Sequence, residues 1–231
     1  MNGGPPGILY EFLVACLYYG FVAASIAELA SAVPSAGGVY HWASLTPGLK
    51  WGRTIGFFTG WLNFFGWIFD LASIVSIPAN ICVQFYANFN PDFTPEAWHT
   101  YLAFVLITWI GAFTCIFCNR LIPYLQQAGL FLIVVGGLVT IIVVAAMPAQ
   151  HASTDFVWRA WDNQTGWNGG VAFLTGVLNG AFAIGTPDAV THMAEELPNP
   201  RKNLPKAIAA QIILGTLSKW TALNQQRLLL I

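Results

Sequence analysis

Long apolar runs separated by short polar segments dominate the pattern of the chain. A membrane-spanning helix needs about 20 consecutive, mostly apolar residues. Five runs reach that length, and they cover residues 8–33, 54–85, 98–117, 122–147 and 167–193. A sixth run, over residues 205–218, stops at Lys219 before it is long enough to cross a membrane. The pattern therefore predicts an all-α integral membrane protein with several spans.

The connector after the first run and the length of the second run add detail to this picture. Residues 34–52 are rich in Gly, Pro and aromatic residues, which makes them too aromatic for a flexible linker. We expect this connector to pack against the helices at the membrane surface. The second run is longer than one crossing requires and contains Pro78, which predicts a tilted or kinked helix.

The fifth run is interrupted near its middle by Gly180, Gly185, Pro187 and Asp188. Proline lacks a backbone N–H group and glycine destabilises a helix, so we expect two half-helices here, with a plain proline kink as the alternative. Backbone polar groups that are freed inside a membrane are tolerated only where they are buried in protein or line a cavity. Such groups can hold an ion or a polar solute.

Composition supports a membrane location and narrows the partners. Hydrophobic residues make up 56% of the chain and charged residues 8%, whereas soluble proteins carry about 25% charged residues. The mean hydropathy is +0.62. The formal net charge of -1 provides no basic field that would attract nucleic acid. We therefore expect the lipid bilayer and small solutes as partners.

The distribution of positive charge predicts the orientation, because cations favour cytoplasmic loops. Counting the connectors alternately places only Arg159, between Asp155 and Asp162, on one side. The opposite side, which should be cytoplasmic, receives Lys50, Arg53, Arg120, Arg201, Lys202 and Lys206.

Acidic side chains inside the runs require an explanation, since a charge at the middle of a membrane costs at least about 2.5–3.5 kcal/mol. Asp70 in the second run either bonds to a neighbouring helix or lines a water-filled path. Asp188 has the stronger case for a path because it follows the expected break. Glu11 and Glu28 lie near the ends of the first run, where we expect them to reach interfacial water or to bond between helices.

Motifs of catalysis and cofactor binding are absent from the sequence. It contains no G-x-S-x-G, no G-x-x-x-x-G-K-[ST] and no G-x-G-x-x-G segment, so we expect neither an enzyme nor a nucleotide-driven pump, and no cofactor. The histidines show no i,i+4 pair at metal-ligand spacing, and we expect no metal. Cys115 and Cys118 form a C-x-x-C in apolar sequence without further ligands, which favours simple packing.

Several segments together resemble the amino acid/polyamine/organocation (APC) transporter superfamily. Residues 28–43, ELASAVPSAGGVYHWA, are similar to the segment after the second helix of that superfamily. Residues 194–205, AEELPNPRKNLP, are similar to its signature after the sixth helix. Residues 55–61 and 180–188 resemble fungal permeases for amino acids, GABA and choline. The resemblance covers about residues 1–217.

The resemblance implies an APC-type (LeuT-like) helix bundle with a five-plus-five inverted repeat. Residues 1–231 would then be a single partial transporter domain that covers about helices 2 to 6 and the start of 7, with Asn2–Gly4 as the tail of helix one. In that family the substrate lies between the broken first and sixth helices, with help from the third and eighth. Here this implies a substrate-binding set of Gly3, Gly4, Phe65, Phe69, Asp70, Gly180, Ala181, Phe182, Ile184, Gly185 and Thr186.

Further roles follow from the same resemblance. Phe182 matches a position that is an aromatic gate in some relatives, and Asp188 and Asp70 become the candidates for proton coupling or amine contacts. The loop that controls inward opening would contain Glu195, Glu196, Arg201 and Lys202.

The implied activity is secondary active transport of a small amino acid, GABA or a choline-like amine by alternating access, driven by protons. The implied location is the plasma membrane or the vacuolar membrane. Most of helix one and everything after the start of helix seven have no counterpart in the chain. The alternative is therefore a truncated membrane protein without transport activity of its own.

Overall fold

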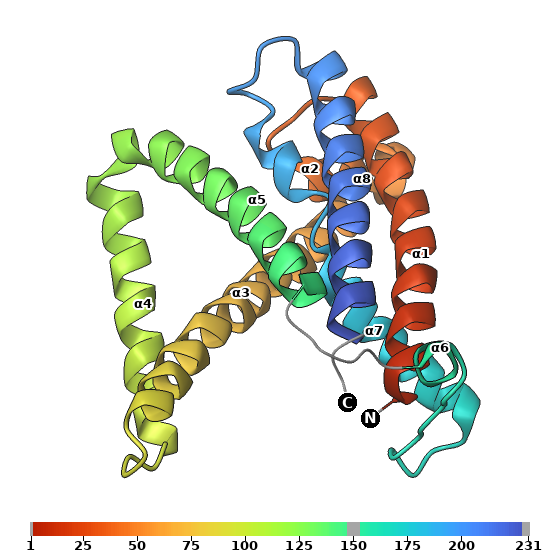
Figure 1. Cartoon of the computed structure of the whole chain (residues 1–231). Coiled ribbons are helices and arrows are strands. Elements are labelled where there is room, and N and C mark those ends of the chain that lie inside the picture. The colour runs from red at the N-terminus through yellow and green to blue at the C-terminus, as the bar shows by residue number, and fades with distance from the viewer. Residues whose placement is uncertain (1, 147–152, 228–231) are drawn as a thin grey trace. The chain divides into compact units, whose positions relative to one another are not determined.

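The computed structural model describes residues 2–146 and 153–227, and every regular element in these ranges is helical. The long helices are α1 (Gly4–Ala32), α3 (Gly48–Phe89), α4 (Ala97–Phe117), α5 (Ile122–Ala146), α7 (Gly169–Ile184) and α8 (Pro200–Arg227) (Figure 1). Two shorter α-helices, α2 (Gly38–Leu45) and α6 (Thr154–Trp158), and two 3₁₀ helices, η1 (Asn119–Leu121) and η2 (Ala189–Met193), complete the order.

Five helical segments of the described ranges are long and apolar enough to cross a membrane, which confirms the predicted all-α membrane protein. They are α1, α3, α4, Asn119–Val143 and Gly169–Met193. Helix α8 does not meet the same criteria, in line with the sixth run being too short. The helix begins at Pro200 and ends at Arg227, so it extends beyond the predicted run at both ends. Met147, the predicted end of the fourth run, lies outside the described residues.

The helices separate into two compact units, each of which is described here by itself. Unit 1 comprises Met1–Gly56 and Val134–Ile231, and unit 2 comprises Phe57–Ile133. Helices α3 and α5 each belong partly to both units. The expectation of one domain over residues 1–231 stays a prediction.

Unit 1 is built around α1, which packs mainly against α7 and α8 (Figure 1). Small side chains on α1 allow the neighbouring helices to approach closely, as is common between helices in membranes. One buried cluster consists of Ala23, Ala30, Trp42, Ala194, Leu204 and Ile208. A second cluster, near the start of α1, pairs Leu9 with Val157 of α6.

The connector at residues 34–52 packs against the helices of unit 1, as predicted, while its place at the membrane surface stays a prediction. Helix α2 lies in its middle, and the Trp42 side chain is buried while its Nε1 atom donates a hydrogen bond of 2.9 Å to the Val33 carbonyl oxygen. Helix α3 already begins at Gly48, six residues before the predicted start of the second run. The connector is therefore more helical than its glycine and proline content suggests.

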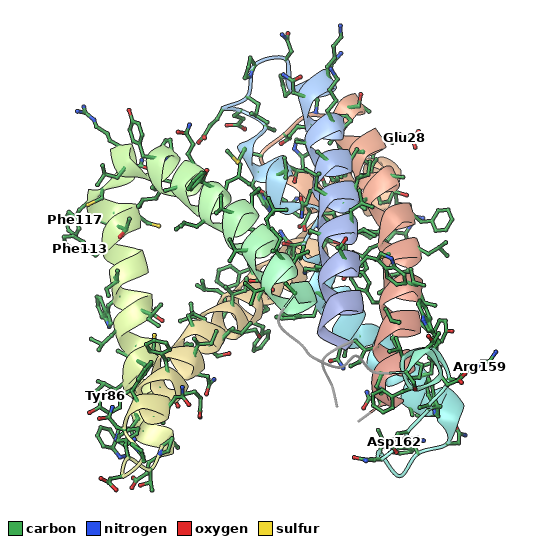
Figure 2. The ribbon with its side chains drawn as sticks, in the orientation of Figure 1. Glu28, Tyr86, Phe113, Phe117, Arg159 and Asp162 are labelled. Atoms are coloured by element: carbon green, nitrogen blue, oxygen red, sulfur yellow. The ribbon has the colours of Figure 1, made fainter. Side chains whose placement is uncertain are left out.

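Many large apolar side chains of unit 2 are exposed. Helix α4 has no buried residue, and the Phe113 and Phe117 side chains project away from it (Figure 2). At its N-terminus, Glu96 and His99 form a capping box that satisfies free backbone N–H groups. Apolar side chains on an outer surface suit helices whose surroundings are lipid or other helices.

Candidate functional site

The break in the fifth run is the feature that defines the candidate site. Helix α7 ends at Ile184, and Gly185 follows with φ 87° and ψ -165°, a backbone region open almost only to glycine. Thr186 and Pro187 are not helical, and the 3₁₀ helix η2 begins at Ala189. The predicted break is confirmed, and the alternative of a kink within a continuous helix is wrong.

Hydrogen bonds occupy part of the backbone that the break exposes. The Thr186 carbonyl oxygen accepts from the Gln211 side-chain amide of α8 at 3.2 Å and from the Ala189 backbone N–H at 3.2 Å. The Asp188 carbonyl oxygen accepts from the Thr191 hydroxyl group at 2.6 Å and from its backbone N–H at 2.9 Å. The break is therefore held in place by a polar side chain from another helix.

Asp188 lies next to α1. Its side chain is half-buried, and its carboxylate is close enough to the Tyr19 phenol group to interact with it electrostatically. Earlier in α7, a Cβ atom on Gly180 would lie 2.9 Å from the Ala15 Cβ atom of α1. Helix α7 thus runs along α1 in the same direction, and its broken end reaches the level of Tyr19.

The predicted binding residues of α7 differ in their exposure. Gly180 is buried against α1, while Ala181, Ile184, Gly185 and Thr186 are half-buried. The Phe182 side chain is 53% exposed. These residues form one continuous stretch that ends at the break.

Gly3 and Gly4 lie at the other end of α1 from this stretch. A Cβ atom on Gly3 would overlap the Trp161 ring, and one on Gly4 would approach the Ala160 carbonyl oxygen at 3.3 Å. The 15 positions between Gly4 and Tyr19 correspond to about 22 Å of α-helix. The structure therefore does not bring the two glycines to the break.

Phe65, Phe69 and Asp70 lie on α3 in unit 2. Trp61 stacks on Phe65 with ring centroids 5.7 Å apart, and the Phe69 carbonyl oxygen accepts a hydrogen bond from Ser73. The Asp70 side chain is half-buried. Their association with the break stays a prediction.

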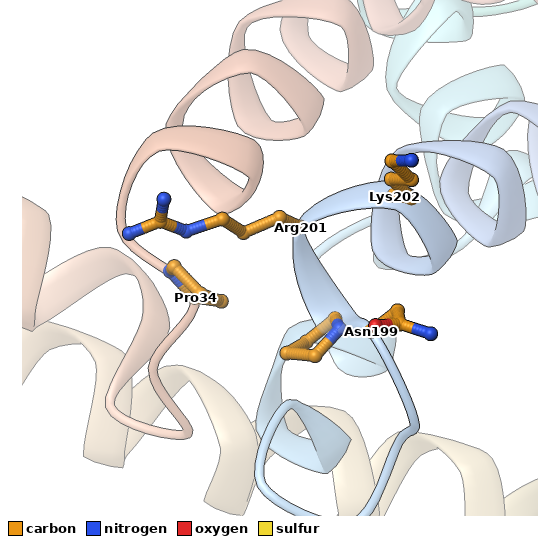
Figure 3. Close-up of a pocket in the computed structure, with 5 residues that line it drawn as sticks. Pro34, Asn199, Arg201 and Lys202 are labelled. Carbon is orange, nitrogen blue, oxygen red and sulfur yellow. The ribbon is translucent and has the colours of Figure 1, made fainter.

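The residues of the predicted gate loop lie before and within the first turn of α8. Glu195 and Glu196 are exposed in the turn before the helix. Arg201 and Lys202 line an open pocket of about 330 Å³ together with Pro34, Asn199 and Pro200 (Figure 3). Arg201 extends beside Pro34, just after the C-terminus of α1, where a helix favours a positive charge (Figure 3).

Contacts at the two ends of α1 agree with the prediction that successive connectors lie on opposite sides of the membrane. The pocket is lined by Pro34, which follows the first run, and by residues 199–202, which lie at the start of α8 and follow the fifth run. At the opposite end, Tyr10 donates to the Trp158 carbonyl oxygen at 3.4 Å, and Asn2 forms a backbone bridge with Asn163. In unit 1, the cations predicted to be cytoplasmic thus lie at the end away from Arg159.

The sequence did not reveal that the Glu11 side chain is enclosed between two helices. Its side chain is 3% exposed and lies between α1 and α7, so it does not reach interfacial water, and the interhelical alternative holds. Its carboxyl group occupies the place where a Cβ atom of Gly176 would be. The available signal was the pair Gly176 and Gly180, because small residues four positions apart mark close helix contacts in membranes. Glu28, in contrast, is exposed and points away from α1 (Figure 2).

No metal site is present in the ranges 2–146 and 153–227, where no three His, Cys, Asp or Glu side chains gather closely enough to hold an ion. The polar groups that the described residues offer at the break include backbone groups, the Asp188 carboxylate, the amide of Gln211 and the Thr191 hydroxyl group.

Comparison with known proteins finds that the chain is similar to fungal proteins named as transporters. It is 32% identical over 218 residues to a protein of Macrophomina phaseolina provisionally assigned as an amino acid/polyamine transporter, covering 94% of this chain and 48% of the relative. It is 31% identical over 217 residues to the choline transporter of Saccharomyces cerevisiae, covering 93% of this chain and 38% of the relative. It is 30% identical over 217 residues to a swainsonine transporter of Arthroderma benhamiae, covering 92% of this chain and 42% of the relative.

The chain thus spans less than half the length of these relatives, which are named as transporters and not as enzymes. No solved structure matches it. A family model described as amino acid permease matches residues 1–222, five residues beyond the extent expected from the motifs. The chain therefore belongs to the amino acid permease family of the APC transporter superfamily.

Proposed function

We propose that this multi-pass membrane protein, at its full length, is a secondary active transporter of a small amino acid, GABA or a choline-like amine. It works by alternating access and is driven by protons. The plasma membrane or the vacuolar membrane is the proposed location.

The break of α7 at Gly185 is the observation that carries this proposal. It lies within a segment, Gly169–Met193, that is long and apolar enough to cross a membrane. Non-helical backbone at that depth is stable only where protein or a water-filled cavity surrounds it. The exposed carbonyl groups suit a cationic amine, and the Asp188 carboxylate adds a negative charge beside them.

The substrate class rests on this chemistry and on the relatives. A choline transporter and an amino acid/polyamine transporter both act, by their names, on solutes that carry an amino or quaternary ammonium group. Carbonyl oxygens and carboxylates are suitable acceptors for such cations, and an aromatic side chain such as Phe182 can offer its face to them.

Uptake into vesicles tests the proposal. The full-length protein is reconstituted, the outside is made acidic, and the accumulation of labelled choline, GABA and amino acids is measured. We expect accumulation of at least one of them, and we expect it to stop when the proton gradient is dissipated. Absence of accumulation of any of these solutes would contradict the proposed substrate class.

The roles of Asp188 and Asp70 are tested in the same vesicles. Asp188→Asn and Asp70→Asn should each lower proton-driven uptake about tenfold or more, a barrier change of about 1.4 kcal/mol, because neither amide can carry a proton or a negative charge. Asp162→Asn is the matched control, since Asp162 is exposed in the loop before α7 and bonds to Gln164. Unchanged uptake in both the Asp188 and the Asp70 variant would refute their assignment.

A further inference from the structure

The open pocket at the start of α8 is lined by two cationic side chains. Arg201 and Lys202 contribute these charges, and Pro34, Asn199 and Pro200 form the rest of the lining (Figure 3). The volume of about 330 Å³ is at the lower end of the range of about 300–1,000 Å³ that is typical of ligand pockets. The pocket is therefore large enough for a small charged group.

The positive charges of this pocket have no acidic partner among the described side chains. Arg201 and Lys202 are both exposed, and no acidic residue in the part of the chain that the structure describes forms an ion pair with either of them. The acids that precede them in the sequence, Glu195 and Glu196, are exposed in the turn before α8. The two cations are therefore available to a ligand.

The sequence around the pocket adds a third positive charge. Residues 199–206, NPRKNLPK, contain no acidic residue. Lys206 is exposed and lies four positions after Lys202, so the two ammonium groups share one face of α8. Like charges at this spacing destabilise a helix, and a bound anion offsets their repulsion. The beginning of α8 therefore favours an anionic partner.

The C-terminus of α1 balances only part of this positive charge. Arg201 extends beside Pro34, which follows that end of the helix (Figure 3). The C-terminus of a helix carries about half of one negative elementary charge. In addition, the Val33 carbonyl oxygen already accepts a hydrogen bond of 2.9 Å from the Trp42 indole group. The charges of the pocket therefore exceed what the helix end supplies.

The pocket lies close to the ends of two segments that are long and apolar enough to cross a membrane. Helix α1 ends at Ala32, two positions before Pro34, and the segment Gly169–Met193 ends six positions before Asn199. Residues just beyond a membrane span lie in the headgroup region of the bilayer. The charge pattern predicts that this end of unit 1 faces the cytoplasm, and the cytoplasmic leaflet contains the anionic lipids.

We propose that this pocket binds the phosphate group of an anionic phospholipid from the cytoplasmic leaflet. Lys202 donates to a phosphate oxygen as a compact positive charge, and the planar guanidinium group of Arg201 suits bidentate contact with two of them. The rings of Pro34 and Pro200 provide apolar walls for the glycerol part of the lipid. The bound lipid contacts the end of α1 and the start of α8, so it links these two helices.

A membrane lipid suits the pocket better than a phosphate ion from solution. The lipid is confined to the bilayer beside the pocket, which gives it a high effective concentration there. Its apolar part also covers the two proline rings, whereas a free ion contacts only the cations and water. The lipid therefore gains binding free energy from two sources.

Binding of a short-chain phosphatidylserine to the purified full-length protein in a neutral detergent tests the site. We expect saturable binding of dioctanoyl phosphatidylserine and much weaker binding of dioctanoyl phosphatidylcholine, whose headgroup has no net charge. Each cation beside an anionic headgroup contributes a factor of about five in affinity. The double substitution of Arg201→Gln with Lys202→Gln should therefore weaken the binding of phosphatidylserine about 30-fold.

The matched control is the double substitution of Lys50→Gln with Arg53→Gln. These residues are exposed, carry the same charges, lie on the same predicted side of the membrane and do not line the pocket. The control should keep the affinity of the wild type. Thermal unfolding gives a second readout, because a ligand that binds the folded protein stabilises it. Phosphatidylserine should raise the unfolding midpoint of the wild type and the control but not that of the pocket variant.

Three results would overturn the proposal. The first is wild-type affinity in the pocket variant, or equal binding of the two lipids by the wild type. The second is an equal loss of affinity in the control, which would show a diffuse effect of positive charge. The third is displacement of phosphatidylserine by inorganic phosphate at the same concentration, which would show a site for the free ion. None of these measurements requires transport, so their outcome is independent of the proposed function.

Discussion

Gly180 lies at a close approach of the backbones of α1 and α7. A Cβ atom there would be 3.0 Å from the Glu11 carbonyl oxygen, 3.1 Å from the Phe12 Cα atom and 2.9 Å from the Ala15 Cβ atom. These are main-chain atoms or atoms bonded directly to the main chain, and they cannot move without displacing α1. The residue at position 180 therefore sets the distance between the two helices.

Gly180→Ala should lower the free energy of unfolding by about 1–3 kcal/mol, the usual cost of overpacking. Gly170→Ala is the matched control on the same helix, because its Cβ atom would meet only the Asn168 Oδ1 atom at 3.6 Å, an ordinary contact. That control should change the stability by no more than about 1 kcal/mol. Thermal unfolding of the purified protein in detergent measures both, and equal midpoints for the two variants would contradict the role of Gly180.

At the scale of single residues, the sequence predicts features that depend on a residue's own backbone chemistry. It does not predict features that depend on contacts with residues distant in the sequence. Gly185 and Pro187 predict a helix end from their own backbone properties, and the structure has one. Glu11 carries no such property. Its burial depends on the glycines of α7, more than 150 positions away, which periodicity and hydropathy cannot reveal.

At the scale of elements, Gln211 connects α8 to the broken end of α7. Its side-chain amide donates to the Thr186 carbonyl oxygen, so α8 supplies a hydrogen bond that the interrupted helix cannot provide itself. The two residues are 25 positions apart in the sequence, and their hydrogen bond is half-buried. It makes the geometry of the break depend on the position of α8.

Gln211→Leu should destabilise the protein by about 1–3 kcal/mol, because it leaves the Thr186 carbonyl oxygen without this donor. Gln211→Glu should recover part of that loss when the pH is lowered, because a protonated carboxyl group has an O–H donor of the same reach. Thermal unfolding checks the stability, and uptake by the full-length protein checks the site. Wild-type behaviour of the leucine variant would show that the hydrogen bond is dispensable.

The predicted elements differ from the observed ones mainly at their ends. Helix α3 extends over 42 residues, and it starts before and ends after the apolar run that predicted it. Helix α8 likewise continues past Lys219, where the apolar pattern stops. Hydropathy identifies the part of a helix that suits lipid, whereas the helix itself continues wherever backbone hydrogen bonds are satisfied.

At the scale of the molecule, the ends of α1 divide unit 1 into a basic end and an opposite end near Arg159. The basic end contains Arg201 and Lys202 beside Pro34, and the other end contains the connector at residues 153–168. This arrangement agrees with the charge pattern that predicts which end faces the cytoplasm. The orientation can be tested directly.

Single cysteines test it after the four natural cysteines have been replaced. Gln164→Cys should react with a membrane-impermeant thiol reagent in intact cells. Lys202→Cys, which is equally exposed, should react only after the membrane has been permeabilised. The extent of labelling on a gel measures both, and the reverse result would invert the proposed topology.

The sequence predicts the number of apolar segments and their class of fold, because both follow from the cost of placing polar groups in lipid. It does not predict which helices pack together. Contacts such as α1 with α7 and α8 depend on small residues at particular faces, and a hydropathy profile averages over faces. The resemblance of its motifs to APC transporters predicts the family, and the match to the family model confirms that prediction.

The hydrogen bond between the His192 side chain and the Ala36 carbonyl oxygen joins residues 156 positions apart, and Gly38 is in close contact with Thr191 beside it. Closing so long a stretch of chain has an entropic cost that grows only slowly with length. Contacts within unit 1 offset that cost, and they hold the segment before residue 57 against the segment after residue 133. A bulkier residue at position 38 would meet the Thr191 hydroxyl group and would weaken this junction between the two segments.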